Sequence, residues 1–370
     1  MRILFSFVGG RGHLEPLLPI AIAAQAAGHE VAIAGKSSVV AGVEGFEVFG
    51  VGAENDAAQT ERTALLEVDP AREARLLRDS LAGENARRRI AELLELSAAR
   101  RPDAIVCDEV DFAAMIAAER IGVPHAAVLV TASGSFVRRE LLADVVDALR
   151  TEHGLPPDPA FGMLGRFLVL SPFPTTFRDP AFPLPPTARG VRLYDVVDGH
   201  DGPTTVYFTL GTIFDLESGD LFERVIAGLG MLAVDVVATV GRRLDPSIFD
   251  PLPPNVRVEQ YVPQTQVLPH CDVVVCHGGS GSVLGALAHG LPLVVLPLGA
   301  DQPENGERCV ATGVGLALDP ETATPAEVRD AVTTVLAEPA YRRAAAGLAA
   351  EVARFAGPDE AVRDLERLVA

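Results

Sequence analysis

The chain has 370 residues, 48% of them hydrophobic, and this length suits two domains of about 150–200 residues each. Its 31 basic and 50 acidic residues give a formal net charge of −19, which argues against nucleic acid or an anionic membrane as the main partner. No apolar run reaches the roughly 18 residues of a spanning helix, and residues 1–10 read as a strand and a glycine turn rather than a signal peptide. We therefore expect a cytoplasmic protein with no integral membrane association and with reduced cysteines.

The first half of the chain alternates between strand-like and helix-like segments. This rhythm predicts a parallel sheet with helices on both faces. The segments 53–70 and 133–165 show neither pattern, and we interpret them as loops. The expected strands are 2–8, 30–34, 104–107 and 126–130, and the expected helices are 14–27, 70–100 and 112–121.

A proline-rich stretch then interrupts this pattern, and the alternation of strand-like and helix-like segments resumes after it. Proline opposes both helix interiors and central strands, so we place an interdomain linker near 186–203. This predicts an α/β protein with Rossmann-like domains at 1–190 and 203–357, and a final segment, 358–370, that could pack back on the first domain. The expected strands are 205–209, 234–239, 256–258, 273–276 and 293–296, and the expected helices are 220–230, one from 280, 325–337 and 340–355.

Three patterns typical of other sites are incomplete. Residues 10–15 follow a strand as a dinucleotide fingerprint does, but Glu15 stands in place of the third glycine. Residues 278–282 approach a hydrolase nucleophile elbow but lack its last glycine, and no histidine follows His289. Cys271 and Cys276 would lie about 16 Å apart on a strand, too far for one zinc ion. We therefore predict no metal and no redox cofactor.

The strongest signal is a glycine-rich turn between the strand at 273–276 and an apolar helix. Glycines let backbone N–H groups approach an anion, and the helix N-terminus adds about half a positive charge. The serines and the histidine can donate further hydrogen bonds, so the turn is a candidate diphosphate cradle. It could also be an ordinary turn with a capping serine. Its residues are His277, Gly278, Gly279, Ser280, Gly281 and Ser282.

Two further groups of polar residues lie at predicted strand ends. Asp301, Gln302 and Asn305 follow the strand at 293–296, and carboxylate and amide groups there suit neighbouring hydroxyls of a ligand. In the first half, His13 follows the first strand and Asp108 ends another. An imidazole can take a proton from a hydroxyl, and a carboxylate can orient it and stabilise its charged form. Asp111 could take the place of Asp108.

The run from Tyr261 to Asn305 resembles the donor-site signature of the UDP-glycosyltransferase superfamily, glycosyltransferase family 1, and is most similar to its bacterial branch that glycosylates antibiotics. The resemblance spans nearly the whole chain and implies the two-domain GT-B fold. Its motifs are Tyr261-Val262-Pro263-Gln264, Leu268-Pro269-His270-Cys271-Asp272, His277 to Ser282, Pro297, Asp301-Gln302-Pro303 and Asn305. Ser282 stands where threonine is commoner and keeps the hydroxyl.

The resemblance also implies roles for individual residues. His13 matches the catalytic base, and Asp108 matches its partner. Val262 and Gln264 match positions that flank the base of the nucleotide, and Gly211-Thr212 match a loop near the phosphates. Residues 277–282 match the diphosphate contacts, while Asp301 and Gln302 match the sugar contacts. The implied reaction is metal-independent, inverting transfer of a (deoxy)hexose from a dTDP- or UDP-sugar to a small hydrophobic hydroxylated acceptor, such as a polyketide or antibiotic aglycone.

Two other functions remain compatible with these residues. The first is a nucleotide-sugar epimerase or hydrolase of the same fold, and the second is a non-catalytic acceptor-binding subunit. The absence of a D-x-D carboxylate pair supports a reaction without metal. The choice between dTDP and UDP, the acceptor and O- or C-transfer stay open, and a homodimer is compatible with the sequence.

Overall fold

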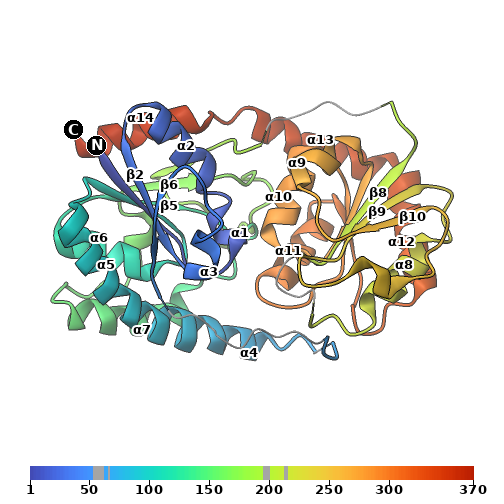
Figure 1. The fold of residues 1–370 in the computed structure, drawn as a ribbon, viewed down its shortest axis with the longest axis horizontal. Coiled ribbons are helices and arrows are strands. Elements are labelled where there is room, and N and C mark those ends of the chain that lie inside the picture. Colours follow the sequence, from blue (N-terminus) through green and yellow to red (C-terminus); the bar gives the residue numbers. More distant parts are fainter. Residues whose placement is uncertain (53–61, 66, 195–200, 212–215) are drawn as a thin grey trace.

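Two parallel sheets, one from each half of the chain, form the framework of this computed structural model (Figure 1). The structure describes residues 1–52, 62–65, 67–194, 201–211 and 216–370. Within these ranges the first sheet has seven strands in the order β3-β2-β1-β4-β5-β6-β7, and the second has six in the order β10-β9-β8-β11-β12-β13. This confirms the predicted class of two parallel-sheet α/β domains that face each other across a cleft.

The strands are short and largely buried. Those of the first sheet are β1 (Arg2–Ser6), β2 (Glu30–Gly35), β3 (Glu47–Gly50), β4 (Ala104–Asp108), β5 (His125–Val128), β6 (Leu168–Ser171) and β7 (Ala188–Gly190). Those of the second are β8 (Thr205–Thr209), β9 (Asp235–Thr239), β10 (Val256–Glu259), β11 (Val273–Cys276), β12 (Leu293–Val295) and β13 (Gly315–Ala317). Every residue of β4 and β11 is buried, as continuous apolar runs in parallel sheets require.

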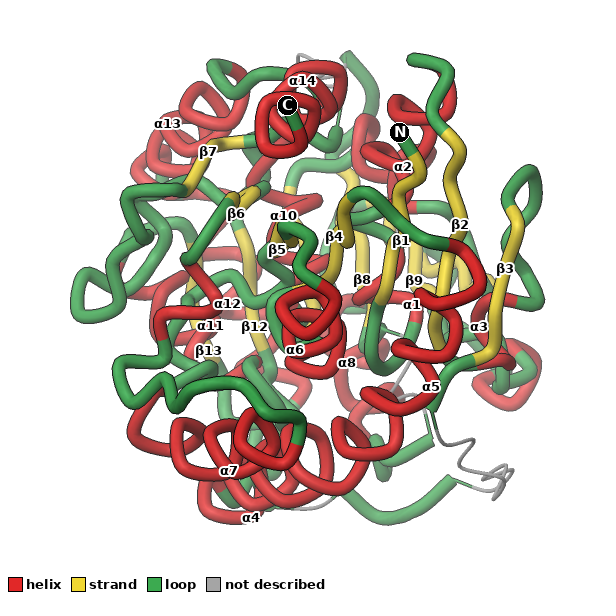
Figure 2. The backbone as a smooth tube through the Cα atoms, turned by 90° about the vertical axis from the view of Figure 1, so that its left-hand side faces the viewer, coloured by secondary structure: helices red, strands yellow, loops and turns green. Residues whose placement is uncertain are grey.

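Helices cover both faces of each sheet. In the first domain α2 and α14 lie on one face and α5 and α6 on the other, and Figure 2 shows the same layers from the side. The helices are α1 (Arg11–Leu14), α2 (Leu18–Ala26), α3 (Ser37–Val40), α4 (Pro70–Arg75), α5 (Ala86–Arg100), α6 (Phe112–Ile121), α7 (Arg139–Glu152), α8 (Leu221–Leu229), α9 (Gln264–Val267), α10 (Ser280–Ala288), α11 (Gln302–Ala311), α12 (Pro325–Ala337), α13 (Pro339–Ala353) and α14 (Pro358–Val369). A π-helical segment, Leu76–Asn85, joins α4 to α5, and short 3-10 turns span Gly162–Gly165, Pro246–Phe249 and Leu268–His270.

The structure differs from the sequence prediction at several elements. The helix predicted at 14–27 is divided into α1 and α2, because Pro16 and Pro19 lack the N–H groups that would bond to the preceding turn. The loop predicted at 133–165 contains α7, a helix of 14 residues. Part of the predicted linker, at 188–190, is β7 and pairs with β6. Most of the loop predicted at 53–70 lies outside the described residues.

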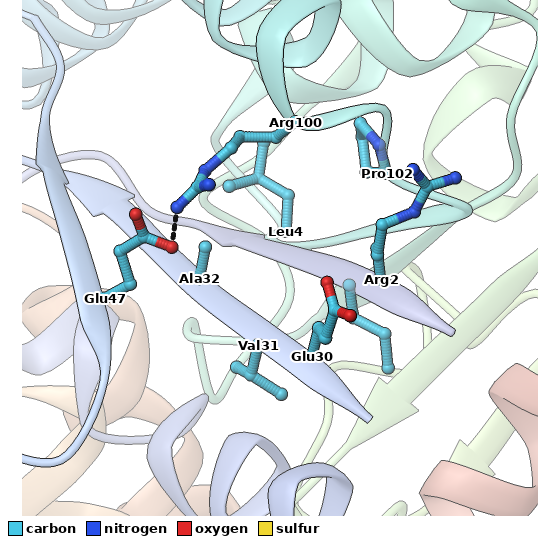
Figure 3. Close-up of a pocket in the computed structure, with 9 residues that line it drawn as sticks. Arg2, Leu4, Glu30, Val31, Ala32, Glu47, Arg100 and Pro102 are labelled. Carbon is cyan, nitrogen blue, oxygen red and sulfur yellow. Dashed lines mark ion pairs between the residues drawn. The ribbon is translucent and has the colours of Figure 1, made fainter. Parts of the chain in front are cut away.

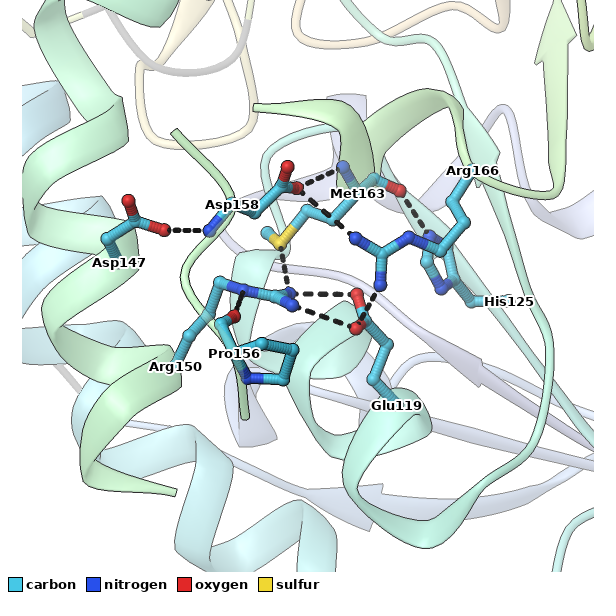
Figure 4. Close-up of polar contacts among 8 residues, drawn as sticks. All are labelled: Glu119, His125, Asp147, Arg150, Pro156, Asp158, Met163 and Arg166. Carbon is cyan, nitrogen blue, oxygen red and sulfur yellow. Dashed lines mark hydrogen bonds and ion pairs between the residues drawn. The ribbon is translucent and has the colours of Figure 1, made fainter. Parts of the chain in front are cut away.

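A buried ion-pair network fixes α7 and the segment after it to the first domain (Figure 4). The Arg150 side chain, which is fully buried, donates from Nη1 and Nη2 to the two carboxylate oxygens of Glu119 at 2.9 and 3.0 Å. Its Nε donates to the carbonyl oxygen of Pro156 at 3.0 Å, and Arg166 also pairs with Glu119. Buried charges are tolerated only when paired in this way, so the network ties α7 to α6.

The two domains are joined by more than the linker. The last helix, α14, returns to the first domain and packs on α2, with Leu365 fully buried against that core and His29 Nε2 3.0 Å from the carboxylate of Glu366. From the other side, residues 62–65 reach the second domain, where Arg62 pairs with Glu223 at 2.7 Å and Leu65 packs against its core. These contacts hold the carboxyl edges of the two sheets opposite each other.

Candidate active site

A cavity of about 450 Å³ lies between the two domains, and both contribute to its lining. In the first sheet Ser6 pairs with Cys107 near the carboxyl ends of β1 and β4, and in the second sheet Cys276 lies opposite Thr209 and Val295. Loops that follow these strands therefore meet at the cavity, as expected for ligand sites in parallel sheets. The predicted site residues that line it are His13, Gly211, Val262, Gln264, His277, Gly279, Ser280, Gly281, Ser282, Asp301 and Gln302.

The structure brings His13 and Asp108 together on the first-domain side. The side chain of His13 is 26% exposed and lines the cavity, whereas Asp108 is fully buried behind it. His13 Nδ1 lies 3.4 Å from Asp108 Oδ2, within ion-pair distance but without hydrogen-bond geometry. Backbone N–H groups of Val8 and Val110 donate to the two oxygens of Asp108 at 2.8 and 2.9 Å. The carboxylate is thus fixed, and the exposed edge of the imidazole faces the cavity.

Two opposing effects act on the pKa of His13. Burial is the largest effect and disfavours the charged imidazole, but the surrounding carboxylates, Asp108 foremost and then Asp301 and Glu109, together outweigh it, so the pKa of His13 lies above its ordinary value. Asp301, from the second domain, acts in the same direction as Asp108. This arrangement stabilises the imidazolium that proton transfer would produce.

The alternative partner, Asp111, is used elsewhere. Its Oδ2 accepts hydrogen bonds from Arg89 Nη2 and from Ser6 Oγ, both at 2.6 Å. Its Oδ1 accepts from the backbone N–H of Ala114, which caps α6. Arg89 and Asp111 are 2% and 1% exposed, so they form a buried ion pair that holds α5 against the sheet. Of the two acids, the structure therefore brings Asp108, and not Asp111, next to His13.

The predicted cradle is a strand–turn–helix corner that needs glycine. Gly278 has φ +84°, and a Cβ there would lie 2.6 Å from a methyl carbon of Val295. Gly211 has φ +76°, and a Cβ there would lie 2.6 Å from the ring of His277. The backbone can therefore turn sharply and present the N-terminus of α10 to the cavity, which is where an anion binds most readily.

The two hydroxyls of the cradle are in different environments. Ser282 Oγ accepts a 3.3 Å hydrogen bond from Gln264 Nε2. Ser280 Oγ, by contrast, accepts hydrogen bonds from the backbone N–H of Ala132 and from Asn305 Nδ2, and donates to Asp301 Oδ2. Burial lowers the pKa of His277 to about 4, so its ring is neutral near pH 7 and has one N–H to donate.

The other predicted donor residues surround the N-terminus of α11. Gln302 Oε1 accepts from the backbone N–H groups of Leu298 and Gly299 at 2.7 and 3.2 Å, which orients its amide beside the cavity. Asn305 is fully buried and, like Gly278 and Asp108, stands behind the lining rather than in it. Thr212 lies outside the described residues.

Sequence reasoning assigned no role to several residues that line the cavity, although Tyr261 begins one of the motifs that carry the family resemblance. Tyr261 is 37% exposed, and the guanidinium carbon of Arg242 lies 3.8 Å from the centre of its ring, so this aromatic face is held in place. Tyr194 and Arg11 come from the first domain. The position of Tyr261 beside Val262 was a usable signal, whereas Tyr194 follows the proline-rich segment and nothing around it marks a site.

A second, smaller cavity, of about 70 Å³, lies at the opposite ends of β1 and β2 (Figure 3). Both arginines of its lining are paired, Arg100 with Glu47 and Arg2 with Asp103. In the described parts of the chain, no group of three or more His, Cys, Asp or Glu residues could hold a metal ion. No helix among the described residues is long and apolar enough to cross a membrane.

Comparison with known proteins points to one group. Residues 223–368 match the family described as the erythromycin biosynthesis protein CIII-like C-terminal domain. Over its whole length the chain is 28% identical to tylactone mycaminosyltransferase of Streptomyces fradiae, of which it covers 93%. It is also 28% identical to 3-alpha-mycarosylerythronolide B desosaminyl transferase of Saccharopolyspora erythraea, of which it covers 99%.

The solved structures agree with the sequence relatives. The crystal structure of the glycosyltransferase VinC in complex with dTDP superimposes with a TM-score of 0.76 at 25% identity, covering 100% of this chain and 99% of VinC. The spinosyn forosaminyltransferase SpnP gives the same TM-score at 27% identity, with the same coverage.

Proposed function

Because the chain belongs to the bacterial natural-product branch of the family 1 glycosyltransferases, we propose that it moves a hexose or deoxyhexose from a dTDP- or UDP-sugar to a hydroxyl of a small aglycone. Its relatives are named as transferases of sugars to antibiotic aglycones. A dTDP-sugar is the first donor to test, since the similar structure of VinC holds dTDP.

One observation carries the proposal: a candidate base and a candidate anion cradle face the same cavity from opposite domains. His13, supported by Asp108, takes the proton of the acceptor hydroxyl as its oxygen attacks the anomeric carbon. The bond from that carbon to the phosphate oxygen breaks, and the nucleoside diphosphate leaves towards the N-terminus of α10. The base and the leaving-group site lie on separate domains, which suits a reaction that proceeds only when the two domains have closed around the substrates.

Inversion and metal independence are part of the proposal. Direct attack by the acceptor oxygen on the face opposite the leaving group inverts the anomeric centre. The charge of the leaving diphosphate is met by the unpaired N–H groups at the start of α10, by the Ser282 hydroxyl and by the neutral His277 ring. These groups would do the work that a divalent cation does in other transferases.

The walls of the cavity near His13 suit an acceptor that is largely hydrophobic but carries polar groups. Val130, Leu193 and Tyr194 line this side and offer apolar surface, and Arg11 and Glu15 line it as well. The four cysteines, Cys107, Cys271, Cys276 and Cys309, are all free and buried, which supports a reducing compartment such as the cytoplasm.

The direct test is a donor panel with and without acceptor. We expect transfer from a dTDP- or UDP-sugar to a polyketide-type aglycone to give the inverted anomer, at a rate that EDTA does not change. Release of free sugar at the same rate without acceptor would favour the hydrolase alternative. Loss of activity in EDTA with recovery in Mg²⁺ would contradict the metal-independent mechanism.

A further inference from the structure

Two hydrogen bonds join the domains directly beside the cavity. The backbone N–H of Ala132 donates to Ser280 Oγ at 2.6 Å, and that of Ser133 donates to Asn305 Oδ1 at 3.0 Å. Ala132, Ser133 and Asn305 are fully buried, and Ser280 is 6% exposed. Water does not compete for these bonds, so losing one partner would leave a buried polar group unsatisfied.

The hydroxyl of Ser280 has no capacity left for a phosphate oxygen. A serine hydroxyl has one hydrogen to donate and two lone pairs to accept with. The hydrogen goes to Asp301 Oδ2 at 2.5 Å, and the oxygen accepts from Ala132 N–H. Asn305 Nδ2 also lies 3.1 Å from this oxygen, but it shares its two hydrogens with the carbonyl oxygen of Gly278 and with Asp301 Oδ2, both at 2.9 Å. Ser282 lies two residues later in the same turn. Among the described residues, its hydroxyl is hydrogen-bonded to Gln264 alone, and it accepts that bond, so its hydrogen is not used there.

The same bonds determine how the Asp301 carboxylate is held. Oδ2 of Asp301 accepts from Ser280 Oγ and, at 2.9 Å, from Asn305 Nδ2, and Asp301 itself lines the cavity. Ser280 and Asn305 thus contact Asp301 on one side and the first domain on the other. The orientation of Asp301 is therefore coupled to the approach of the two domains.

On the first-domain side, a buried carboxylate shapes the segment that makes this contact. Glu109 Oε1 accepts from the backbone N–H groups of Val130 and Thr131 at 2.8 and 2.5 Å, and from the Thr131 hydroxyl at 2.7 Å. The next two N–H groups, those of Ala132 and Ser133, point to the second domain. Four consecutive N–H groups are thus divided between Glu109 and the donor side of the cavity.

We infer that Ser280 and Asn305 are positioning residues, which join the two domains by hydrogen bonds and orient Asp301. The Ser280 hydroxyl is then not a ligand of the diphosphate. This rests on the proposed function, because Asp301 is taken to contact the transferred sugar. It assigns different tasks to the two serines of one turn: Ser282 binds the nucleotide, and Ser280 transmits domain closure to the sugar site.

Ser280→Ala and Ser282→Ala make a matched pair, since each removes one hydroxyl from the same turn. Calorimetric titration with dTDP measures nucleotide affinity, and steady-state kinetics separate kcat from KM. For Ser280→Ala we expect Kd for dTDP within about 3-fold of the wild type and kcat lower by about 10–100-fold, the loss typical of a misplaced sugar. For Ser282→Ala we expect Kd to rise by about 10-fold or more, as for a lost charge-assisted hydrogen bond. Ser280→Thr, which keeps the hydroxyl, should recover most of kcat.

Each other outcome has a defined meaning. If Ser280→Ala weakens dTDP as much as Ser282→Ala does, Ser280 is a phosphate ligand and the inference is overturned. If Ser280→Ala changes neither Kd nor kcat, the hydrogen bonds of the Ser280 hydroxyl do not position Asp301, and the inference is again overturned. Ser280→Cys, which keeps the shape but donates weakly, replaces the alanine variant if that fails to fold. A wild-type chain that binds no nucleoside diphosphate would instead contradict the proposed function.

Discussion

Two histidines line one cavity, and their surroundings suit them to different tasks. Burial lowers the pKa of His277 to about 4, so this ring stays neutral and can only donate one hydrogen bond. Burial also disfavours the charged form of His13, but the carboxylates around it, Asp108 foremost, raise its pKa above the ordinary value. A ring that must accept a proton needs that carboxylate, whereas a ring that only donates to a phosphate does not.

Asp108→Asn tests the electrostatic part of this pairing. The base acts only when neutral, so activity should fall as pH drops through the pKa of His13. Because Asp108 raises that pKa, the variant should move the acid limb of kcat/KM to lower pH, and it should also lower the plateau rate because the imidazolium is less stabilised. A pH–rate profile is the measurement. An acid limb at the same pH in both proteins would mean that the pKa of His13 does not govern it.

At the scale of elements, the sequence best predicts those strands and helices whose residues follow one simple pattern of burial. β4 and β11 were identified because buried parallel strands are continuous apolar runs. β3 and β13 each contain a glycine and are mostly half-buried or exposed, so neither shows the continuous apolar run by which a buried strand is recognised. The π-helical segment at 76–85 and the division between α1 and α2 depend on hydrogen-bond register and on proline, which periodicity does not report.

The buried network that holds α7 gives a prediction at this scale. Arg150→Ala should lower the free energy of unfolding by about 3–5 kcal/mol, because it removes one partner of a buried ion pair and leaves Glu119 with Arg166 alone. Arg87→Ala is the control, since Arg87 pairs with Glu152 on the surface and the loss there should stay below about 1 kcal/mol. Urea denaturation measures both. Equal losses in the two variants would contradict a structural role for the buried network.

At the scale of the whole molecule, the sequence predicts each half of the candidate site but not how the halves meet. His13, His277 and Asp301 were found because each follows a strand and belongs to a recognisable motif. The contacts of Ser280 and Asn305 with the first domain were not, because their partners are backbone N–H groups of residues 132 and 133. Backbone groups carry no sequence signal, so contacts of this kind emerge only from the structure.

The separation of the two half-sites makes His13→Ala the most direct test of the account. His13 lies on α1 of the first domain, while the proposed nucleotide contacts lie on the second. A positioned general base contributes about 10²–10⁴-fold, or roughly 3–5 kcal/mol of barrier. We therefore expect the variant to bind dTDP with unchanged Kd but to transfer sugar to a hydroxyl acceptor at least about 100-fold more slowly. A folded His13→Ala protein with near-normal transfer would contradict it.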